Sequence, residues 1–304
     1  MATESEVEQY IRAGEIACRA REEAERLVRA GVRVLDLAEV IEKMIRDLGG
    51  ELAFPVNISI DNVAAHYTPL PDDSTVIGEN AVVKIDIGVH VNGYIADTAT
   101  TVVLSDVYRI LAEAAQQALE KGLSVISVGR RFSDVGSVID SVIRSYGFKP
   151  IYNLSGHRID RYQIHAGETI PNFGDRLNLG KFRPGCVYAV EPFATNGSGF
   201  VVESNVVTIY ALKYNPKKLM KISAEAGNFY SSVYSGRRSL PFAKRWYVKS
   251  YCERIDDILL ELESKGLLTK YPVLIEKHNG IVTQFEHTVV ISHRGEVIVT
   301  TNTC

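Results

Sequence analysis

The segment KIDIGVHVNGYIADTAT, residues 84–100, determines the local geometry from which the fold can be inferred. Asn92-Gly93 separates two runs of alternating apolar residues, which is the strongest short-range signal for a β-hairpin. We therefore expect strands over residues 81–89 and 94–104 that pair antiparallel, with Val91 opposite Tyr94.

In that register Asp86 faces Ala99, and Asp97 lies two residues further along. Side chains alternate between faces with period two, so both carboxylates lie on one face as diagonal neighbours about 7–8 Å apart. Two like charges in this position need a neutralising partner, for which the candidates are a metal cation, a shared proton and Lys84. The alternative is a solvated acid pair with no function, and the hairpin alone leaves both interpretations open.

The elements around the hairpin follow an order that occurs twice: two amphipathic helices, then strands. The expected helices cover residues 5–28, 36–48, 106–121 and 133–146, and the second group of strands covers residues 151–164 and a hairpin over 187–209 that turns at 196–199. This order predicts an α+β fold with two pseudo-symmetric halves.

Residues 211–272 interrupt the pattern and differ in charge. They hold eight Lys and four Arg against two Asp and four Glu, a net charge of +6 in a chain whose total is −3. A helical pattern over 250–266 and a turn into a small wing indicate an inserted helical, winged-helix-like subdomain. The predicted catalytic domain then comprises residues 1–210 and 273–304.

The composition indicates a globular protein: 304 residues, 46% of them hydrophobic. We expect no membrane span, because no apolar run approaches about 18 residues. The acidic start lacks the pattern of a secretory signal. The four cysteines, Cys18, Cys186, Cys252 and Cys304, are scattered, which predicts neither a disulfide framework nor a thiolate zinc site. We therefore expect a soluble, cytoplasmic protein.

Two further carboxylates stand alone in apolar strand-like segments. Glu191 lies in YAVEPF, and Glu286 lies in QFEHTVVI. Burying an unpaired charge is costly, and a bound metal is one way to offset that cost. His66 and His157 also lie in such segments, although a lone histidine there is more often structural.

Five separated motifs carry a family resemblance. They are Phe54-Pro55 with Ala64-Ala65-His66-Tyr67-Thr68-Pro69, the two halves of the hairpin, Gly156-His157 with Tyr162-Gln163-Ile164-His165, Glu191-Pro192-Phe193-Ala194, and Gln284-Phe285-Glu286-His287-Thr288. In order and spacing the chain resembles the type 2 methionine aminopeptidases, a branch of the pita-bread (creatinase/aminopeptidase) metallohydrolases. The 211–272 insertion distinguishes type 2 from type 1, and the short start resembles the compact archaeal form.

The resemblance implies a centre of two divalent ions (Co, Mn, Fe or Zn), held by Asp86, Asp97, His157, Glu191 and Glu286. Asp97 and Glu286 would bridge the ions. A hard, oxygen-rich ligand set of this kind suits Mn²⁺, Fe²⁺ or Co²⁺ at least as well as Zn²⁺. His90 and His287 match no family ligand, and we expect them to be structural.

The same resemblance implies the remaining site residues. Glu191 would also carry a proton to the leaving amine, His66 would stabilise the tetrahedral oxyanion, and His165 would orient the peptide. Phe54 and Ile164 would line the slot for the methionine side chain. His157 and His165 can share a pocket only if the chain turns between them, near Asp160-Arg161.

The expected activity is removal of the N-terminal methionine from nascent proteins and peptides, with a small second residue preferred. We also expect a monomer, with the basic insertion as a candidate ribosome contact. One alternative is a related aminopeptidase P or prolidase. Another is a non-catalytic homologue that binds ribosomes or RNA, for which the basic insertion is the supporting feature.

Overall fold

The computed structural model describes residues 4–252 and 254–304. Its helices are α1 (Glu4–Leu27), α2 (Val34–Asp47), η1 (Asp106–Tyr108), α3 (Arg109–Ser124), α4 (Phe132–Ser145), α5 (Pro216–Leu219), α6 (Ala224–Arg237), α7 (Arg245–Tyr251) and α8 (Arg254–Ser264). Its strands are β1 (Glu51–Leu52), β2 (Asn57–Ile60), β3 (Val63–Ala65), β4 (Val82–Val91), β5 (Tyr94–Val103), β6 (Lys149–Pro150), β7 (Ser155–Ile159), β8 (Thr169–Pro171), β9 (Cys186–Val190), β10 (Phe193–Thr195), β11 (Val201–Leu212), β12 (Phe242–Ala243), β13 (Leu268–Glu276), β14 (Val282–Gln284), β15 (His287–Ile291) and β16 (Val297–Val299).

The predicted hairpin is confirmed in its register. Val91 pairs with Tyr94, Asp86 with Ala99, and Gly88 with Asp97. Asn92 and Gly93 have φ angles of 54° and 88°, the left-handed conformation that a two-residue turn of this kind requires.

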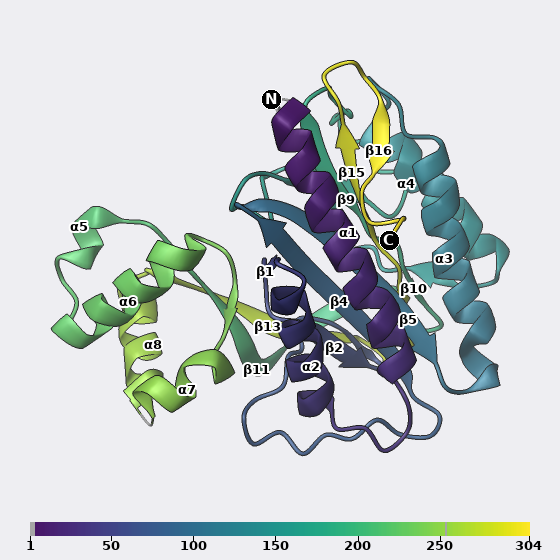
Figure 1. Cartoon of the computed structure of the whole chain (residues 1–304). Coiled ribbons are helices and arrows are strands. Elements are labelled where there is room, and N and C mark those ends of the chain that lie inside the picture. The colour runs from purple at the N-terminus through teal and green to yellow at the C-terminus, as the bar shows by residue number, and fades with distance from the viewer. Residues whose placement is uncertain (1–3, 253) are drawn as a thin grey trace.

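Each half of the molecule has two helices packed on antiparallel strands, as the repeated order predicted. In the first half, α2 packs on β1 and β2, and α1 packs on β4 and β5, which it crosses in Figure 1. Its buried face is rich in alanine, so that α1 lies close to the strands. In the second half, α3 and α4 pack with β9, β10 and β15 around a core that includes Phe132 and Tyr188.

The strands form four sheets, with strand orders β1-β4-β2 (β5 also pairs with β4), β14-β10-β6, β12-β11-β13-β3 and β16-β15-β9-β7-β8. The prediction of a hairpin over 187–209 is wrong. β10 pairs with β14 and β6, whereas β11 pairs with β12 and β13. The chain changes sheet at 196–199, where the buried Glu276 carboxylate accepts hydrogen bonds from the backbone N–H groups of Ser198 and Gly199.

The insertion forms a helical lobe between β11 and β13, at one side of the molecule in Figure 1. It has an apolar core of its own, which includes Phe229, Phe242 and Leu262. The single helix expected over 250–266 is instead divided between two helices. Helix α7 ends at Tyr251, where Cys252 adopts a φ of 48°, and α8 begins at Arg254. The division into a catalytic domain and a subdomain stays a prediction.

The absence of disulfides expected from the cysteine spacing is contradicted. Cys18 of α1 and Cys304 form a disulfide across 286 residues of sequence. The C-terminal segment runs beside α1 (Figure 1), and this proximity arises from tertiary packing that spacing along the chain cannot show. Among the described residues, no helix is both long and apolar enough to span a bilayer.

Candidate metal centre and substrate pocket

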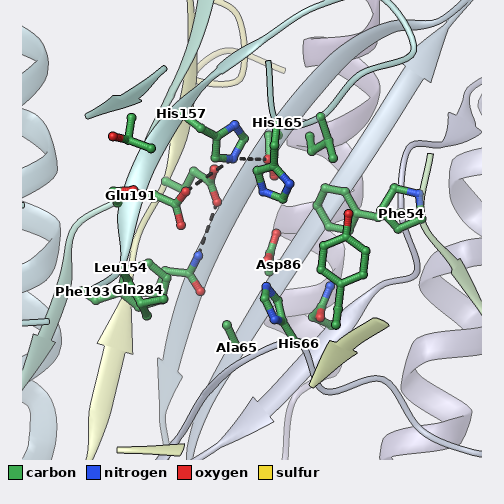
Figure 2. A pocket seen from close by; sticks show the side chains of 18 of the residues that line it. Phe54, Ala65, His66, Asp86, Leu154, His157, His165, Glu191, Phe193 and Gln284 are labelled. Atoms are coloured by element: carbon green, nitrogen blue, oxygen red, sulfur yellow. Dashed lines mark hydrogen bonds and ion pairs between the residues drawn. The ribbon is translucent and has the colours of Figure 1, made fainter. Parts of the chain in front are cut away.

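One cavity of about 380 Å³ brings together all nine residues that the sequence singled out. It is lined by Phe54, His66, Asp86, Asp97, His157, Ile164, His165, Glu191 and Glu286, among others. Figure 2 shows His157 and Glu191 at one side of this cavity and Phe54 at the other, with Asp86 and His66 between them.

The five candidate ligands reach the cavity from different strands. Asp86 lies on β4 and Asp97 on β5, while His157 lies on β7, and Glu191 directly follows β9. Glu286 stands between β14 and β15, where its backbone N–H donates to the carbonyl of Ala99 at 3.0 Å. This bridge joins the hairpin to the C-terminal strands, so the two halves of the molecule meet at the carboxylates.

The candidate ligand atoms are close enough to share a cation. The Nε2 atom of His157 lies 3.6 Å from an Asp97 oxygen and 3.4 Å from a Glu191 oxygen. Ligand atoms of Asp97, His157 and Glu286 all lie within 4.8 Å of one another, and all three residues are buried.

Lys84 does not neutralise the Asp86–Asp97 pair. Its ammonium is buried and donates to the backbone carbonyls of Asp61 at 2.9 Å and Val282 at 2.8 Å. One of the three partners proposed for the acid pair is thereby removed, which leaves a cation or a shared proton.

The protein environment alone disfavours the charged form of every carboxylate in the centre. Burial raises the pKa of Asp86 to about 7. Burial, and then repulsion from neighbouring acids, raises the pKa values of Asp97, Glu191 and Glu286 well above their usual range. Burial also lowers the pKa of His157 well below its ordinary value, so its imidazole is a neutral ligand. The cluster therefore has no positive charge of its own to stabilise the carboxylates in their charged form.

The unused donor atoms fit a metal. One oxygen each of Asp86, Asp97 and Glu286 is buried without a hydrogen-bond partner among the residues that the structure describes. Such orphaned buried atoms are rare in folded proteins and indicate that an ion or another group binds there. Four carboxylates with one neutral imidazole form an oxygen-rich ligand set for a divalent cation.

His165 lies at the same cavity as His157 because the chain turns between them. Asp160 and Gln163 form a bridge, and Tyr162 adopts a φ of 55°. The rings of His157 and His165 are consequently 4.5 Å apart, which confirms the turn expected near Asp160-Arg161.

Comparisons with known proteins identify the family. The model of metallopeptidase family M24 matches residues 8–293. The chain belongs to metallopeptidase family M24. A methionine aminopeptidase of Saccharolobus solfataricus is 42% identical over 98% of this chain and 98% of its own length. A methionine aminopeptidase of Pyrococcus abyssi is 45% identical over 97% of this chain and 99% of its own.

Solved structures confirm the pita-bread fold of this M24 chain. A thermophilic Arx1 superposes with a TM-score of 0.86 at 19% identity, covering 99% of this chain and 91% of that one. A methionine aminopeptidase of Thermotoga maritima superposes with a TM-score of 0.71 at 20% identity, covering 98% and 97%. At these identities the similarity concerns the fold, while the family match makes the protein a metal-dependent peptidase.

Sequence reasoning missed one aromatic residue of the M24 pocket. Tyr271 on β13 lines the cavity, with its ring 5.6 Å from that of His66 and 6.3 Å from that of His165. It belongs to the segment that the sequence assigned to the wing of the insertion. The only available signal was an aromatic residue at the start of a strand, which by itself does not indicate a site.

His287 and His90 contact protein groups, as expected for structural histidines. His287 Nδ1 lies 2.8 Å from the hydroxyl of Thr301 and 3.3 Å from the Arg21 guanidinium. His90 Nδ1 accepts the backbone N–H of Gly93 at 3.2 Å.

Proposed function

We propose that the protein is a type 2 methionine aminopeptidase, which removes the N-terminal methionine from nascent proteins and peptides when the second residue is small. Relatives named methionine aminopeptidase match it over 97–98% of its length. The helical insertion before the last group of strands supports type 2. The observation that carries the proposal is one cavity whose lining includes the five candidate ligands, His66, His165 and the apolar side chains of Phe54 and Ile164.

Two divalent ions, Co, Mn, Fe or Zn, would be held by Asp86, Asp97, His157, Glu191 and Glu286. When bound, such ions lower the pKa of a water molecule and polarise the scissile carbonyl. The protein supplies buried ligands whose charge is otherwise uncompensated, and this favours uptake of cations.

Glu191 would move a proton from the attacking water to the leaving amine. Its carboxylate lies at the edge of the ligand cluster, 3.4 Å from His157 Nε2. A carboxyl whose pKa is raised by burial exchanges protons near neutral pH more readily than an exposed one.

The tautomer of His66 favours a role other than the expected one. Its Nδ1 lies 3.2 Å from the carbonyl of Pro272, which can only accept, so Nδ1 carries the proton. Burial, and then His165, lowers the pKa of His66 to about 4, so the ring is neutral and Nε2 has a free lone pair. We propose that Nε2 accepts a hydrogen bond from the N–H of the scissile amide, whereas stabilising an oxyanion would need a donor.

Phe54 and Ile164 would form the slot for an unbranched methionine side chain. Both are buried members of one apolar cluster and both line the cavity. His165 would orient the peptide beyond the scissile bond, because its ring stands between His157 and Tyr271.

Peptide turnover with metal analysis tests the proposal. Protein purified without added cations is analysed for metal content and assayed for release of methionine from Met-Ala-Ser, with an Ala-Pro peptide in parallel. We expect two bound ions per chain at full activity and methionine release only. Cleavage of the Ala-Pro peptide would indicate an aminopeptidase P or prolidase instead. Absence of both activities in protein that has bound metal would refute the proposed peptidase activity.

The basic insertion is the proposed ribosome contact of a cytoplasmic monomer. Lys213, Lys217, Lys218 and Lys221 are exposed on and beside α5. Basic surfaces attract phosphate backbones in a salt-dependent manner. We expect co-sedimentation with ribosomes at low salt to weaken in a Lys217→Glu/Lys218→Glu variant, while peptide turnover stays unchanged. Equal sedimentation of variant and wild type would refute this contact.

A further inference from the structure

A buried polar junction joins the inserted lobe to the first half of the molecule. Glu42 of α2 is 3% exposed, and its carboxylate accepts hydrogen bonds from the backbone N–H of Val56 at 3.3 Å and from Trp246 Nε1 at 2.8 Å. The guanidinium of Arg245, on α7, forms an ion pair with the same carboxylate. Figure 1 shows α7 on the part of the lobe nearest to α2.

Arg245 extends this junction to the segment that carries His66. Its guanidinium donates to the Thr68 hydroxyl and, at 3.3 Å, to the carbonyl of Pro69. The Thr68 hydroxyl donates in turn to the carbonyl of Val56 at 2.8 Å. Residues 56 and 68 are therefore tied to each other and to the lobe, and His66 lies two residues before Thr68.

Arg237, the last residue of α6, connects the lobe to the segment that carries Phe54. Its guanidinium donates to the carbonyls of Leu52 at 3.0 Å and Ala53 at 3.3 Å, the two residues before Phe54. It also lies over the Trp246 ring at 4.7 Å, so Trp246 connects Arg237 with Glu42.

The lobe also supports the apolar slot directly. Leu240 is buried in the same cluster as Phe54 and Ile164, although these residues come from three distant parts of the sequence. The carbonyl of Pro241, at the cavity wall, accepts from Arg237 at 2.6 Å.

We propose that Glu42, Arg237 and Arg245, here called the latch, are positioning residues that fix Phe54 and His66 relative to each other. Through the latch, the inserted lobe would contribute to selectivity for the methionine side chain. This inference rests on the proposed function, since it assigns the slot to that side chain.

The chemistry of the latch suits positioning better than stability. A buried ion pair adds little net stability over apolar residues of the same size, because desolvation of both charges offsets their attraction. What it supplies is directional contacts, and a binding site needs its walls held within about 0.5 Å by such supporting groups.

Two variants and one control test the latch. Glu42→Met/Arg245→Met removes both charges together and so leaves no unpaired buried charge. Arg237→Met removes the bonds to the Phe54 segment. Asp256→Asn is the control, because it breaks an ion pair at the surface of the same lobe, between Asp256 of α8 and Lys244 just before α7.

Kinetics give the first readout. For both latch variants we expect KM for Met-Ala-Ser to rise by about fivefold or more, with kcat changed by less than threefold and metal content unchanged. The ratio of kcat/KM for Met-Ala-Ser to kcat/KM for Leu-Ala-Ser should fall by a similar factor. The control should have the KM and the ratio of the wild type. Folded latch variants with wild-type KM and wild-type preference would overturn the proposal.

Hydrogen exchange gives a readout that does not depend on turnover. We expect amides of residues 50–58 and 66–70 to exchange at least tenfold faster in the latch variants, with residues 82–103 unaffected. Unchanged exchange there would overturn the positioning role by itself. If the wild type releases no methionine, the proposed function fails, and the exchange data still decide whether the latch holds these segments.

Discussion

The ring of Phe54 lies against the backbone of Gly88, at the place where a side chain on residue 88 would begin. A Cβ on Gly88 would overlap the ring carbons of Phe54, and residue 88 pairs with Asp97 across the hairpin. The proposed wall of the substrate slot therefore touches the strands that carry the candidate ligands Asp86 and Asp97, and it does so at a residue without a side chain.

Gly88→Ala should therefore weaken substrate binding more than metal binding. The backbone at Gly88 is that of an ordinary strand, so alanine fits the fold while its methyl group displaces Phe54. We expect KM for Met-Ala-Ser to rise by about tenfold, with metal content unchanged. Gly78→Ala is the control, since a Cβ there meets nothing within 4 Å. A KM that is unchanged in Gly88→Ala would show that Phe54 does not contact the substrate.

Glu286→Gln and Asp97→Asn should abolish activity and preserve the fold. Each removes one of the two carboxylates proposed to bridge the ions and one of the like charges that raise the pKa values of their neighbours. We expect at least a 10³-fold loss of turnover, reduced metal content, and a Tm in chelator equal to or above that of the wild type. Calorimetry and metal analysis check this, and an active Glu286→Gln protein would contradict the proposed centre.

Stabilisation by added metal should increase with pH. In the metal-free protein the carboxyl pKa values are raised above their unfolded values, so the folded state binds more protons and loses stability as pH rises towards the folded pKa values. Cations bind the deprotonated ligands and reverse this loss. We expect the increase in Tm on adding Mn²⁺ or Co²⁺ to be larger at pH 8 than at pH 6. Equal increases at both pH values would argue against carboxylate ligands.

Removing the His66 ring should eliminate turnover and leave the metal in place. His66 lines the cavity but bonds to Pro272 rather than to the carboxylates. For His66→Ala we expect kcat to fall by about 10²–10³-fold, the size of loss found when one hydrogen bond to the reacting group is removed, with metal stoichiometry equal to the wild type. Loss of metal from this variant would instead place His66 among the ligands.

Glu276→Gln should destabilise the protein. The Glu276 carboxylate is 1% exposed and accepts from four backbone N–H groups, those of Ser198, Gly199, His278 and Gly280. Loss of the charged acceptor should cost about 2–4 kcal/mol at pH 7. Urea unfolding of both proteins measures this cost.

The cost of Glu276→Gln should also depend on pH. Burial alone would raise the pKa of Glu276, but hydrogen bonds from Ser198 and the backbone hold it below its usual value. The stabilisation is therefore fully present above the unfolded pKa of about 4.3 and is lost as pH falls through the folded value. A difference between variant and wild type that does not shrink as pH falls below the unfolded pKa of about 4.3 would contradict this account.

The hairpin and its carboxylate pair could be predicted because both depend on local rules. Asn92-Gly93 sets the register, and the alternation of side chains then places Asp86 and Asp97 on one face. The convergence of His157, Glu191 and Glu286 on that face could be expected only from the family resemblance, since these residues come from separate strands.

The features that were missed depend on distant packing. Residues 196–199 look like a hairpin turn, but Glu276, almost 80 residues away, holds them where the chain changes sheet. The latch joins Glu42 with Arg245 across 203 residues of sequence. Neither residue belongs to a motif. Glu42 looked like an ordinary charged position on a helix, and Arg245 was one of the basic residues of the insertion.

The Cys18–Cys304 bond makes the chain between these residues a covalent ring that contains the entire candidate site. A single proteolytic cut in an exposed segment, such as the one around Leu177 and Leu179, would open this ring without dividing the molecule. The nicked protein would migrate as one species on a denaturing gel until a thiol reductant releases two fragments. Conversely, reduction frees the C-terminal end that lies beside α1 without breaking the backbone.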